Sequence, residues 1–239
     1  MAMITVNSIA KMIDHSILHP TYTDDDLRNN CEIAEKYHTA TVCVKPYHTK
    51  MAADILRDSD VAVCAVIGFP HGNSTIDIKV AETVQVIKDG AVEVDMVVNI
   101  GKVLQADWDY IDNELRAIHD ICLKCKVLLK VIFETDYLPL DEDKIKLCNL
   151  CNKHMVIFAK TSTGYGFVKD RDGKYSYTGA TEHDIKLMRR HCSPEVHIKA
   201  SGGIRTLDQI LRMRELGVTR VGATATVTIM EEAKNRFKL

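Results

Sequence analysis

Eight short runs rich in valine and isoleucine alternate along the chain with eight longer stretches of helical periodicity. Runs that are apolar throughout favour parallel strands that helices cover on the outside. The predicted strands are 12–18, 41–44, 61–68, 92–98, 127–134, 155–160, 196–200 and 220–223. The predicted helices are 24–37, 47–56, 75–88, 107–125, 141–154, 181–191, 206–216 and 226–236. Eight such units in 239 residues indicate an α/β fold, a TIM (β/α)8 barrel, with an open doubly wound sheet as the competing arrangement.

Local signals support these boundaries. Thr23 precedes a helical pattern and has Asp26 three residues later, which is the carboxylate form of a capping box. Gly90 and Gly217 follow helical stretches and come directly before predicted strands, as helix-ending glycines do. The sequence contains no linker or low-complexity tract, so we expect one domain over 1–239.

Charge and hydropathy exclude several function classes. The net charge is −2, with 31 basic and 33 acidic residues and no basic run, which disfavours nucleic acid and anionic membranes as partners. No window approaches 18 consecutive apolar residues, and residues 1–15 lack the apolar core of a signal peptide. The sequence therefore predicts a soluble, cytoplasmic protein without nucleic-acid or membrane partners.

The chain has eight cysteines: Cys31, Cys43, Cys64, Cys122, Cys125, Cys148, Cys151 and Cys192. Reduced thiols are expected, because a secretory signal is lacking. Cys122 and Cys125, with Cys148 and Cys151, have the spacing of a four-cysteine zinc site. Both pairs lie in helical stretches without a glycine turn, so buried helix faces are the favoured interpretation and no metal is predicted.

Three lysines lie in or at the end of predicted strands: Lys130, Lys160 and Lys199. Desolvating an ammonium group is costly, so lysine is rarely buried without a reason. Asp95 lies in the strand before that of Lys130, and these four strands are expected to be neighbours. Active sites of TIM barrels lie at the carboxyl ends of the strands, so the four side chains are expected to converge there.

A neutral lysine can attack a carbonyl group, but the ordinary lysine pKa of about 10.4 keeps the amine charged at neutral pH. Burial and a second ammonium lower that pKa, and Lys199 is positioned to act in this way on Lys160. Asp95, with a water between, is suited to move protons to and from an imine. This pattern favours Schiff-base chemistry; the alternatives are lysines solvated at the barrel rim and a structural Asp95 that neutralises one of them.

Two glycine-containing loops come after the last two predicted strands, and each leads into a helix. They are 200–203 (Ala-Ser-Gly-Gly) and 221–224 (Val-Gly-Ala-Thr). Glycine lets backbone N–H groups approach an anion, and a helix N-terminus favours negative charge. These loops are a common phosphate site in such barrels, although glycine is also the default residue of a tight turn.

The ordered motifs of the chain resemble those of the DeoC family of class I aldolases, the deoxyribose-phosphate aldolases, along essentially its whole length. The similar segments are 13–18, 42–44, 68–73 (Gly-Phe-Pro-His-Gly-Asn), 93–95, 128–135, 160–164 (Lys-Thr-Ser-Thr-Gly) and 199–206. The resemblance implies a lyase that reversibly cleaves 2-deoxy-D-ribose 5-phosphate to D-glyceraldehyde 3-phosphate and acetaldehyde. It further implies no cofactor or metal, phosphosugar and aldehyde partners, a role in deoxyribonucleotide catabolism, and a homodimer by analogy.

The same resemblance assigns residue roles. Lys160 corresponds to the lysine that forms the imine, Lys199 to the lysine that lowers its pKa, and Asp95 to the acid that relays protons. The expected substrate-binding residues are Asp14, Cys43, Lys130, Thr163, Gly164, Gly202, Gly203, Gly222 and Thr224.

Three features depart from the family pattern. Thr224 and Ala225 replace two serines that meet the phosphate, so an aldolase acting on a different or unphosphorylated substrate is the alternative function, followed by a non-catalytic phosphate-binding barrel. Residues 167–178 are an insertion whose Asp-Gly turn predicts a hairpin. We expect it either to cover the barrel mouth, with cations near the phosphate from Lys169, Arg171 and Lys174, or to be a solvated surface hairpin. His19 replaces a lysine, without an evident consequence.

Overall fold

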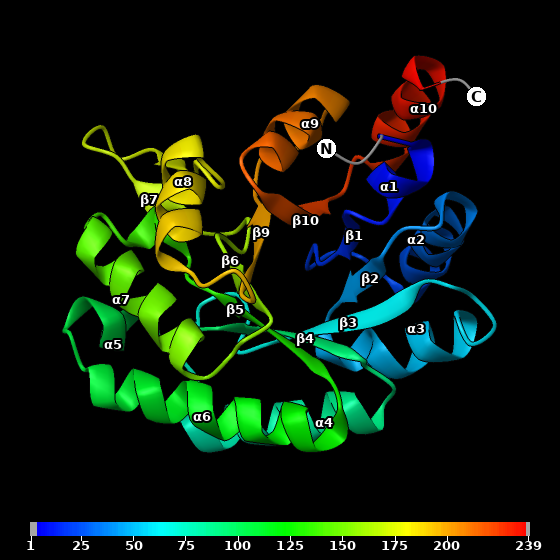
Figure 1. Ribbon diagram of the computed structural model, residues 1–239. Coiled ribbons are helices and arrows are strands. Elements are labelled where there is room, and N and C mark those ends of the chain that lie inside the picture. Colours follow the sequence, from blue (N-terminus) through cyan, green and yellow to red (C-terminus); the bar gives the residue numbers. More distant parts are fainter. Residues whose placement is uncertain (1–3, 238–239) are drawn as a thin grey trace.

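Eight parallel strands close into a barrel in the structure, a computed structural model that describes residues 4–237 (Figure 1). The order around the barrel is β1-β10-β9-β6-β5-β4-β3-β2. The strands are β1 (Ile13–Ile17), β2 (Thr41–Val44), β3 (Ala62–Ile67), β4 (Glu93–Val97), β5 (Leu128–Ile132), β6 (Phe158–Lys160), β9 (His197–Ser201) and β10 (Val218–Ala223). Pairing of β1 with β10 completes the ring, so the predicted TIM barrel is confirmed and the open sheet is excluded. The predicted domain range of 1–239 extends beyond the described residues at both ends.

Helices surround this barrel. They are α1 (Val6–Ala10), α2 (Asp24–Tyr37), α3 (Thr49–Ile55), α4 (Ile76–Lys88), α5 (Ile100–Leu104), α6 (Trp108–Cys125), α7 (Asp141–Lys153), α8 (Glu182–His191), α9 (Leu207–Glu215) and α10 (Thr226–Arg236). All eight predicted helices are present. Helices α1 and α5 were not predicted, because five residues are too few to establish a helical period.

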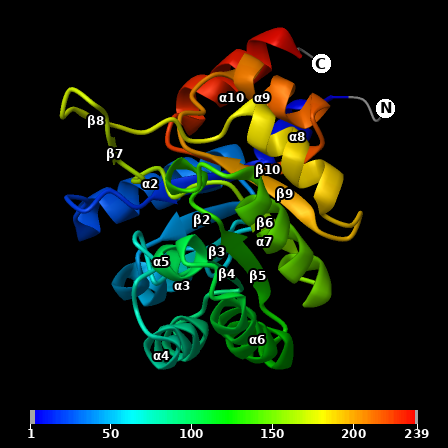
Figure 2. The same ribbon diagram turned by 90° about the vertical axis from the view of Figure 1, so that its left-hand side faces the viewer.

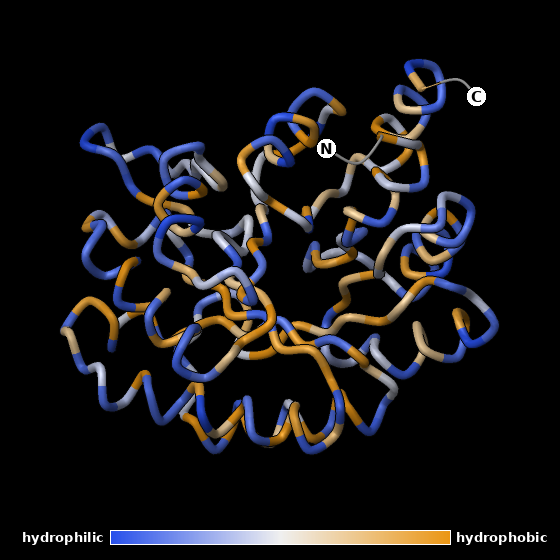
Figure 3. Tube along the Cα trace, viewed as in Figure 1, coloured by the Kyte–Doolittle hydropathy of each residue, from blue (hydrophilic) through white to orange (hydrophobic). Residues whose placement is uncertain are grey.

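The helices have one hydrophobic and one hydrophilic side, which is visible as alternating colours along α4 and α6 in Figure 3. The predicted capping box of α2 is present, since Thr23 accepts a hydrogen bond from the Asp26 backbone and Asp26 accepts one from that of Thr23. Gly90 and Gly217 have φ angles of 106° and 90°, which explains why glycine ends these turns.

Three predicted strand boundaries were wrong by two residues or more, one of them because β10 begins at Val218 and not at residue 220. The strand expected over 127–134 ends at Ile132, and Glu134 has a left-handed backbone with φ of 58°. The strand expected from residue 155 begins at Phe158, and Met155 has φ of 51°. Apolar composition does not reveal a left-handed backbone, so both strands were extended into the adjoining turns.

The inserted segment forms the predicted hairpin. Strands β7 (Val168–Lys169) and β8 (Tyr175–Ser176) pair antiparallel, and Gly173 in the turn has φ of 81°. In Figure 2 this hairpin stands out from the body of the barrel.

The described parts of both chain ends lie on the same side of the molecule, where α1 packs against α10 (Figure 1). Within residues 4–237, no helix combines the length and apolar composition that crossing a membrane requires.

Candidate active site

The four strands that carry the predicted catalytic residues are neighbours in the barrel, in the order β4, β5, β6 and β9. Asp95 lies opposite Lys130 in the register between β4 and β5. Lys160 lies opposite Lys199 in the register between β6 and β9. Because paired residues of parallel strands point to the same face, all four side chains converge inside the barrel, as predicted from the sequence.

Asp95 is the centre of this group and is fully buried. Its Oδ2 atom lies 2.8 Å from Nζ of Lys160 and 2.7 Å from Nζ of Lys199. Its Oδ1 atom accepts a hydrogen bond from Nζ of Lys130 at 2.7 Å and from Sγ of Cys64 at 3.1 Å. Asp95 therefore contacts the lysine amine directly, whereas the sequence analysis expected a water between them.

A second set of charges lies next to the first. Nζ of Lys199 is 2.5 Å from Oδ2 of Asp14, and Nη1 of Arg220 is 2.6 Å from Oδ1 of Asp14. Glu93 joins the two sets, since its Oε2 atom lies 2.6 Å from Nζ of Lys130 and 3.2 Å from Nη1 of Arg220. Sequence reasoning did not assign roles to Glu93 and Arg220, although each is a charged residue within an apolar strand.

The connected group contains four cations, Lys130, Lys160, Lys199 and Arg220, and three carboxylates, Asp14, Glu93 and Asp95. If all were ionised, the group would carry one surplus positive charge. Among the residues described, Lys160 pairs with Asp95 alone, and it shares that oxygen with Lys199. Lys160 is thus the cation of this group that is least compensated by negative charge.

The pKa directions of the neighbours agree with this distribution. Burial opposes the charge of Lys199, but the carboxylates of Asp14 and Asp95 outweigh it and raise the Lys199 pKa above its ordinary value. Burial likewise opposes ionisation of Asp95, but Lys130, Lys160 and Lys199 hold its pKa well below the ordinary value. Lys199 therefore stays an ammonium and Asp95 a carboxylate.

A cavity of about 470 Å³ opens above this charged group. Ten of the residues predicted from the sequence line it: Asp14, Cys43, Lys160, Thr163, Gly164, Lys199, Gly202, Gly203, Gly222 and Thr224. Asp95 and Lys130 do not line it and lie beneath, both fully buried. The ammonium of Lys130 is enclosed by Glu93, Asp95 and Cys64. Lys130 therefore supports the charged group from below and does not lie in the cavity wall, where a substrate-binding residue was expected.

Several cavity residues were not among the site residues predicted by name: Ser16, Leu18, Pro20, Tyr165, Phe167, Tyr177, Ser201, Ile204, Arg205 and Ala223. His19, singled out as a departure from the family pattern, also lines the cavity. A signal for Arg205 was available, because it follows the glycine loop directly and offers a guanidinium near an expected anion.

One end of the cavity is rich in glycine. Gly164, Gly202 and Gly203 have φ angles of 86°, 87° and 80°, a conformation that side chains disfavour. A Cβ atom at Gly222 would lie 3.0 Å from Cβ of Ser201, so the two neighbouring strands approach closely there. Helix α10 starts just beyond Thr224, which adds the favourable field of a helix N-terminus. This end of the cavity suits an anion.

The base of the inserted hairpin contributes to the cavity, and its tip does not. Phe167 and Tyr177 line the cavity and pack edge to face, with ring centroids 5.4 Å apart. Lys169, Arg171 and Lys174 are not among the lining residues, and Nζ of Lys169 lies over the Tyr175 ring at 5.7 Å. The expected phosphate contact from these three cations is not supported, and the exposed tip fits the surface-hairpin alternative.

Within residues 4–237, two groups of side chains offer ligand atoms close enough for one metal ion: Cys43 with Cys64 and Asp95, and Asp141 with His183 and Asp184. Lysine ammonium groups already pair with carboxylates of each group. Nζ of Lys144 lies 2.7 Å from Asp184 and 3.3 Å from Asp141, as the three lysines lie around Asp95. This positive charge opposes a divalent cation. The four cysteines of the two helical pairs belong to neither group, and of these only Cys125 is exposed, which agrees with buried helix faces.

Comparisons with known proteins agree on one family. Residues 8–225 match the model of a family described as DeoC/LacD family aldolase. The chain is 42% identical over 237 residues to a deoxyribose-phosphate aldolase of Rhodopirellula baltica, with 99% of this chain and 94% of that protein covered. It is 44% identical over 223 residues to a deoxyribose-phosphate aldolase of Bacillus cytotoxicus, with 93% and 95% covered. The solved structure of QR15, an aldolase, superimposes with a TM-score of 0.86 at 33% identity and covers 95% of this chain and 96% of that one. The matched residues include all eight barrel strands with Asp95, Lys160 and Lys199, and the chain belongs to the DeoC/LacD family of aldolases.

Proposed function

We propose that this protein is a class I aldolase that reversibly cleaves 2-deoxy-D-ribose 5-phosphate to D-glyceraldehyde 3-phosphate and acetaldehyde. The observation that carries the proposal is the sharing of one Asp95 oxygen by Lys160 and Lys199 at the floor of a cavity with an anion-binding end. The names of the relatives support the choice of substrate.

In the proposed reaction, the neutral amine of Lys160 attacks the aldehyde carbon (C1) of the open-chain sugar, and loss of water with uptake of one proton leaves a protonated imine. The C3 hydroxyl then loses its proton, the bond between C2 and C3 breaks, and its electron pair forms an enamine with the imine carbon. Protonation of C2 and hydrolysis release acetaldehyde and restore Lys160. The contact of Asp95 with both lysine nitrogens suits it to accept and return protons during these steps.

Borohydride trapping tests the nucleophile. Incubation with 2-deoxyribose 5-phosphate and sodium borohydride is expected to leave a reduced two-carbon adduct on Lys160, identified by peptide mass mapping. Lys160→Ala is expected to give no adduct and no cleavage, whereas the exposed control Lys186→Ala is expected to retain both. Full activity in Lys160→Ala, or an adduct on another lysine, would contradict the mechanism.

The second candidate function is an aldolase that prefers an unphosphorylated sugar or another aldehyde. Ala225 motivates it, because one hydroxyl expected beside the phosphate is missing. We expect kcat/KM for 2-deoxyribose 5-phosphate to exceed that for 2-deoxyribose, since Arg205 and the glycine loops line the cavity. Equal values, or a preference for 2-deoxyribose, would favour the second candidate.

We also propose a cytoplasmic role in the breakdown of deoxyribonucleotide-derived sugars, with a homodimer as the assembly. Eight free cysteines suit a reducing compartment. Light scattering on the purified protein tests the dimer.

A further inference from the structure

One wall of the active-site cavity is formed by residues 163–179, the segment that leaves β6, forms the hairpin and returns to α8. Thr163, Gly164, Tyr165, Phe167 and Tyr177 of this segment line the cavity. A connecting segment of this length needs fixed ends, because ordering a loop costs conformational entropy.

Glu134 holds the departing end of this wall. Its fully buried carboxylate accepts hydrogen bonds from the backbone N–H of Thr163, at 3.1 Å and 3.3 Å to its two oxygens, and from the Thr163 hydroxyl. The same hydroxyl accepts a hydrogen bond from the backbone N–H of Tyr165 at 2.9 Å. The hydroxyl proton and the backbone N–H of Thr163 are therefore both donated to Glu134. This contact fixes the place of Thr163 in the cavity lining.

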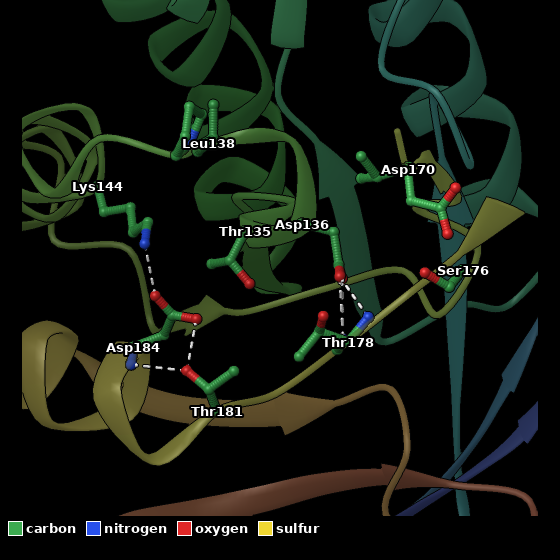
Figure 4. Close-up of a pocket in the computed structure, with 12 residues that line it drawn as sticks. Thr135, Asp136, Leu138, Lys144, Asp170, Ser176, Thr178, Thr181 and Asp184 are labelled. Carbon is green, nitrogen blue, oxygen red and sulfur yellow. Dashed lines mark hydrogen bonds and ion pairs between the residues drawn. The ribbon is translucent and has the colours of Figure 1, made fainter. Parts of the chain in front are cut away.

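Asp136 holds the returning end, as Figure 4 shows for its contact with Thr178. Its Oδ1 atom accepts a hydrogen bond from the backbone N–H of Thr178 at 2.6 Å, and its Oδ2 atom accepts one from that of Gly179 at 3.0 Å. Gly179 in turn lies against the anion-binding loop, since a Cβ atom there would come within 2.5 Å of the Gly202 carbonyl oxygen. Asp136 thus fixes Gly179, and Gly179 packs against the backbone of Gly202.

Both anchors belong to a single short turn after β5, in which η2 spans Thr135–Tyr137. Gly166 passes directly beside them, because a Cβ atom at this position would lie 2.9 Å from Cδ of Glu134 and 3.2 Å from Cβ of Asp136. Neither carboxylate forms an ion pair with a residue of the described range, and neither lines the active-site cavity. Both carboxylates accept hydrogen bonds from the 163–179 wall, and neither has a role in the proposed reaction.

We propose that Glu134 and Asp136 are positioning residues that fix the 163–179 wall against the Gly202–Gly203 loop and thereby set the affinity for the phosphate-bearing half of the substrate. The inference rests on the proposed function. It separates two halves of the site: the imine chemistry depends on Lys160, Asp95 and Lys199, whereas binding of the phosphate end depends on this turn.

The experiment compares Glu134→Ala and Asp136→Ala with their conservative counterparts Glu134→Gln and Asp136→Asn. Asp170→Ala is the matched control. Asp170 also accepts two backbone hydrogen bonds, from Asp172 at 2.9 Å and Lys174 at 2.8 Å, but it does so at the hairpin tip, outside the active-site cavity. Gly166→Ala perturbs the same contact without removing a carboxylate, and so serves if an alanine variant fails to fold.

Two readouts distinguish the halves of the site. We expect KM for 2-deoxyribose 5-phosphate to rise at least tenfold in Glu134→Ala, Asp136→Ala and Gly166→Ala, and to recover most of that change in the conservative variants. We expect borohydride trapping of acetaldehyde on Lys160, which needs no phosphate site, to stay within threefold of wild type. Asp170→Ala is expected to leave both readouts unchanged.

The inference would be overturned if Asp170→Ala raised KM as much as Asp136→Ala, if the alanine variants left KM unchanged, or if trapping of acetaldehyde fell by as large a factor as KM rose. Absence of an acetaldehyde adduct in the wild-type protein would instead refute the proposed function. The two failures are therefore distinguishable in one set of measurements.

Discussion

Lys160 and Lys199 lie opposite each other on β6 and β9, and their side-chain nitrogens contact the same oxygen of Asp95, at 2.8 Å and 2.7 Å. Lys199 has a second carboxylate partner in Asp14, whereas Lys160 has none among the residues that the structure describes. This asymmetry separates the roles of two chemically identical side chains. The better-compensated lysine remains charged, because the carboxylates of Asp14 and Asp95 raise its pKa, and the other lysine is the nucleophile of the proposed mechanism.

Removing the charge of Lys199 is expected to impair the reaction through Lys160. In Lys199→Met, Lys160 becomes the only cation on Oδ2 of Asp95, and Asp95 loses one of the cations that hold its pKa below the ordinary value. We expect kcat/KM at neutral pH to fall by about 100-fold or more, in the range of proton-transfer contributions, and the pH at which activity rises to move upward. Lys199→Arg keeps the charge and is expected to keep the wild-type pH profile at reduced activity. An unchanged pH profile in Lys199→Met would contradict this account.

A hydroxyl restored at position 225 is expected to improve phosphate binding. Thr224 lines the cavity and Ala225 is the residue before α10. Ala225→Ser is expected to lower KM for 2-deoxyribose 5-phosphate by about two- to tenfold, the effect of one net hydrogen bond of roughly 0.5–1.5 kcal/mol. KM for 2-deoxyribose serves as the control and is expected not to change. If both KM values changed equally, the hydroxyl would act on α10 rather than on the phosphate.

Glu134 is expected to make stability depend on pH. Burial, helped by the negative charge of Asp136, raises its pKa to about 7, and the hydrogen bonds from Thr163 and the charge of Lys160 oppose that rise. Its ordinary value is 4.5, so between these pH values the folded state holds a proton that the unfolded chain has lost. The stabilisation is present at low pH and is lost as the pH rises through about 7.

This dependence is measured against Glu134→Gln, which cannot ionise. The free energy of unfolding of the wild type, relative to the variant, is expected to fall by about 2–3 kcal/mol between about pH 5 and pH 8, from 1.36 kcal/mol per pKa unit. Urea denaturation at both pH values gives the difference, in which all other titrating groups cancel. A difference that stays constant, or grows with pH, would show that the carboxyl ionises normally.

The buried ion pair between α4 and α6 is expected to be important for stability and not for activity. Nζ of Lys79 lies 2.6 Å from Oε1 of Glu114, both side chains are fully buried, and the ammonium also donates to the Val97 carbonyl at 2.7 Å. Lys79→Met leaves the Glu114 carboxylate buried without its partner and is expected to cost about 3–5 kcal/mol in urea denaturation.

Two comparisons check that interpretation. The double variant Lys79→Met/Glu114→Leu removes both charges and is expected to be more stable than Lys79→Met alone. Lys50→Met breaks the exposed pair with Asp54 and is expected to change stability by less than about 1 kcal/mol. A double variant no more stable than the single one would mean that packing, not charge, makes the position sensitive.

By itself, the sequence determined the number and order of the barrel strands and of the eight longer helices, because apolar runs, caps and terminal glycines are local signals. It also identified Asp95, Lys160 and Lys199, since charged residues inside apolar strands stand out and the adjoining motifs resemble one family. Ten of the predicted residues line one cavity, because the carboxyl ends of parallel strands meet at one face of the barrel.

Only the tertiary structure decided which charges share which partner. Glu93 and Arg220 are 127 positions apart and meet only because the barrel closes. Closure also placed Lys130 beneath the cavity rather than in its wall, and brought the turn that contains Glu134 and Asp136 against both ends of the 163–179 segment. These relationships depend on through-space distances between strands and loops, and electrostatic and hydrogen-bonding energies follow those distances, not separation along the chain.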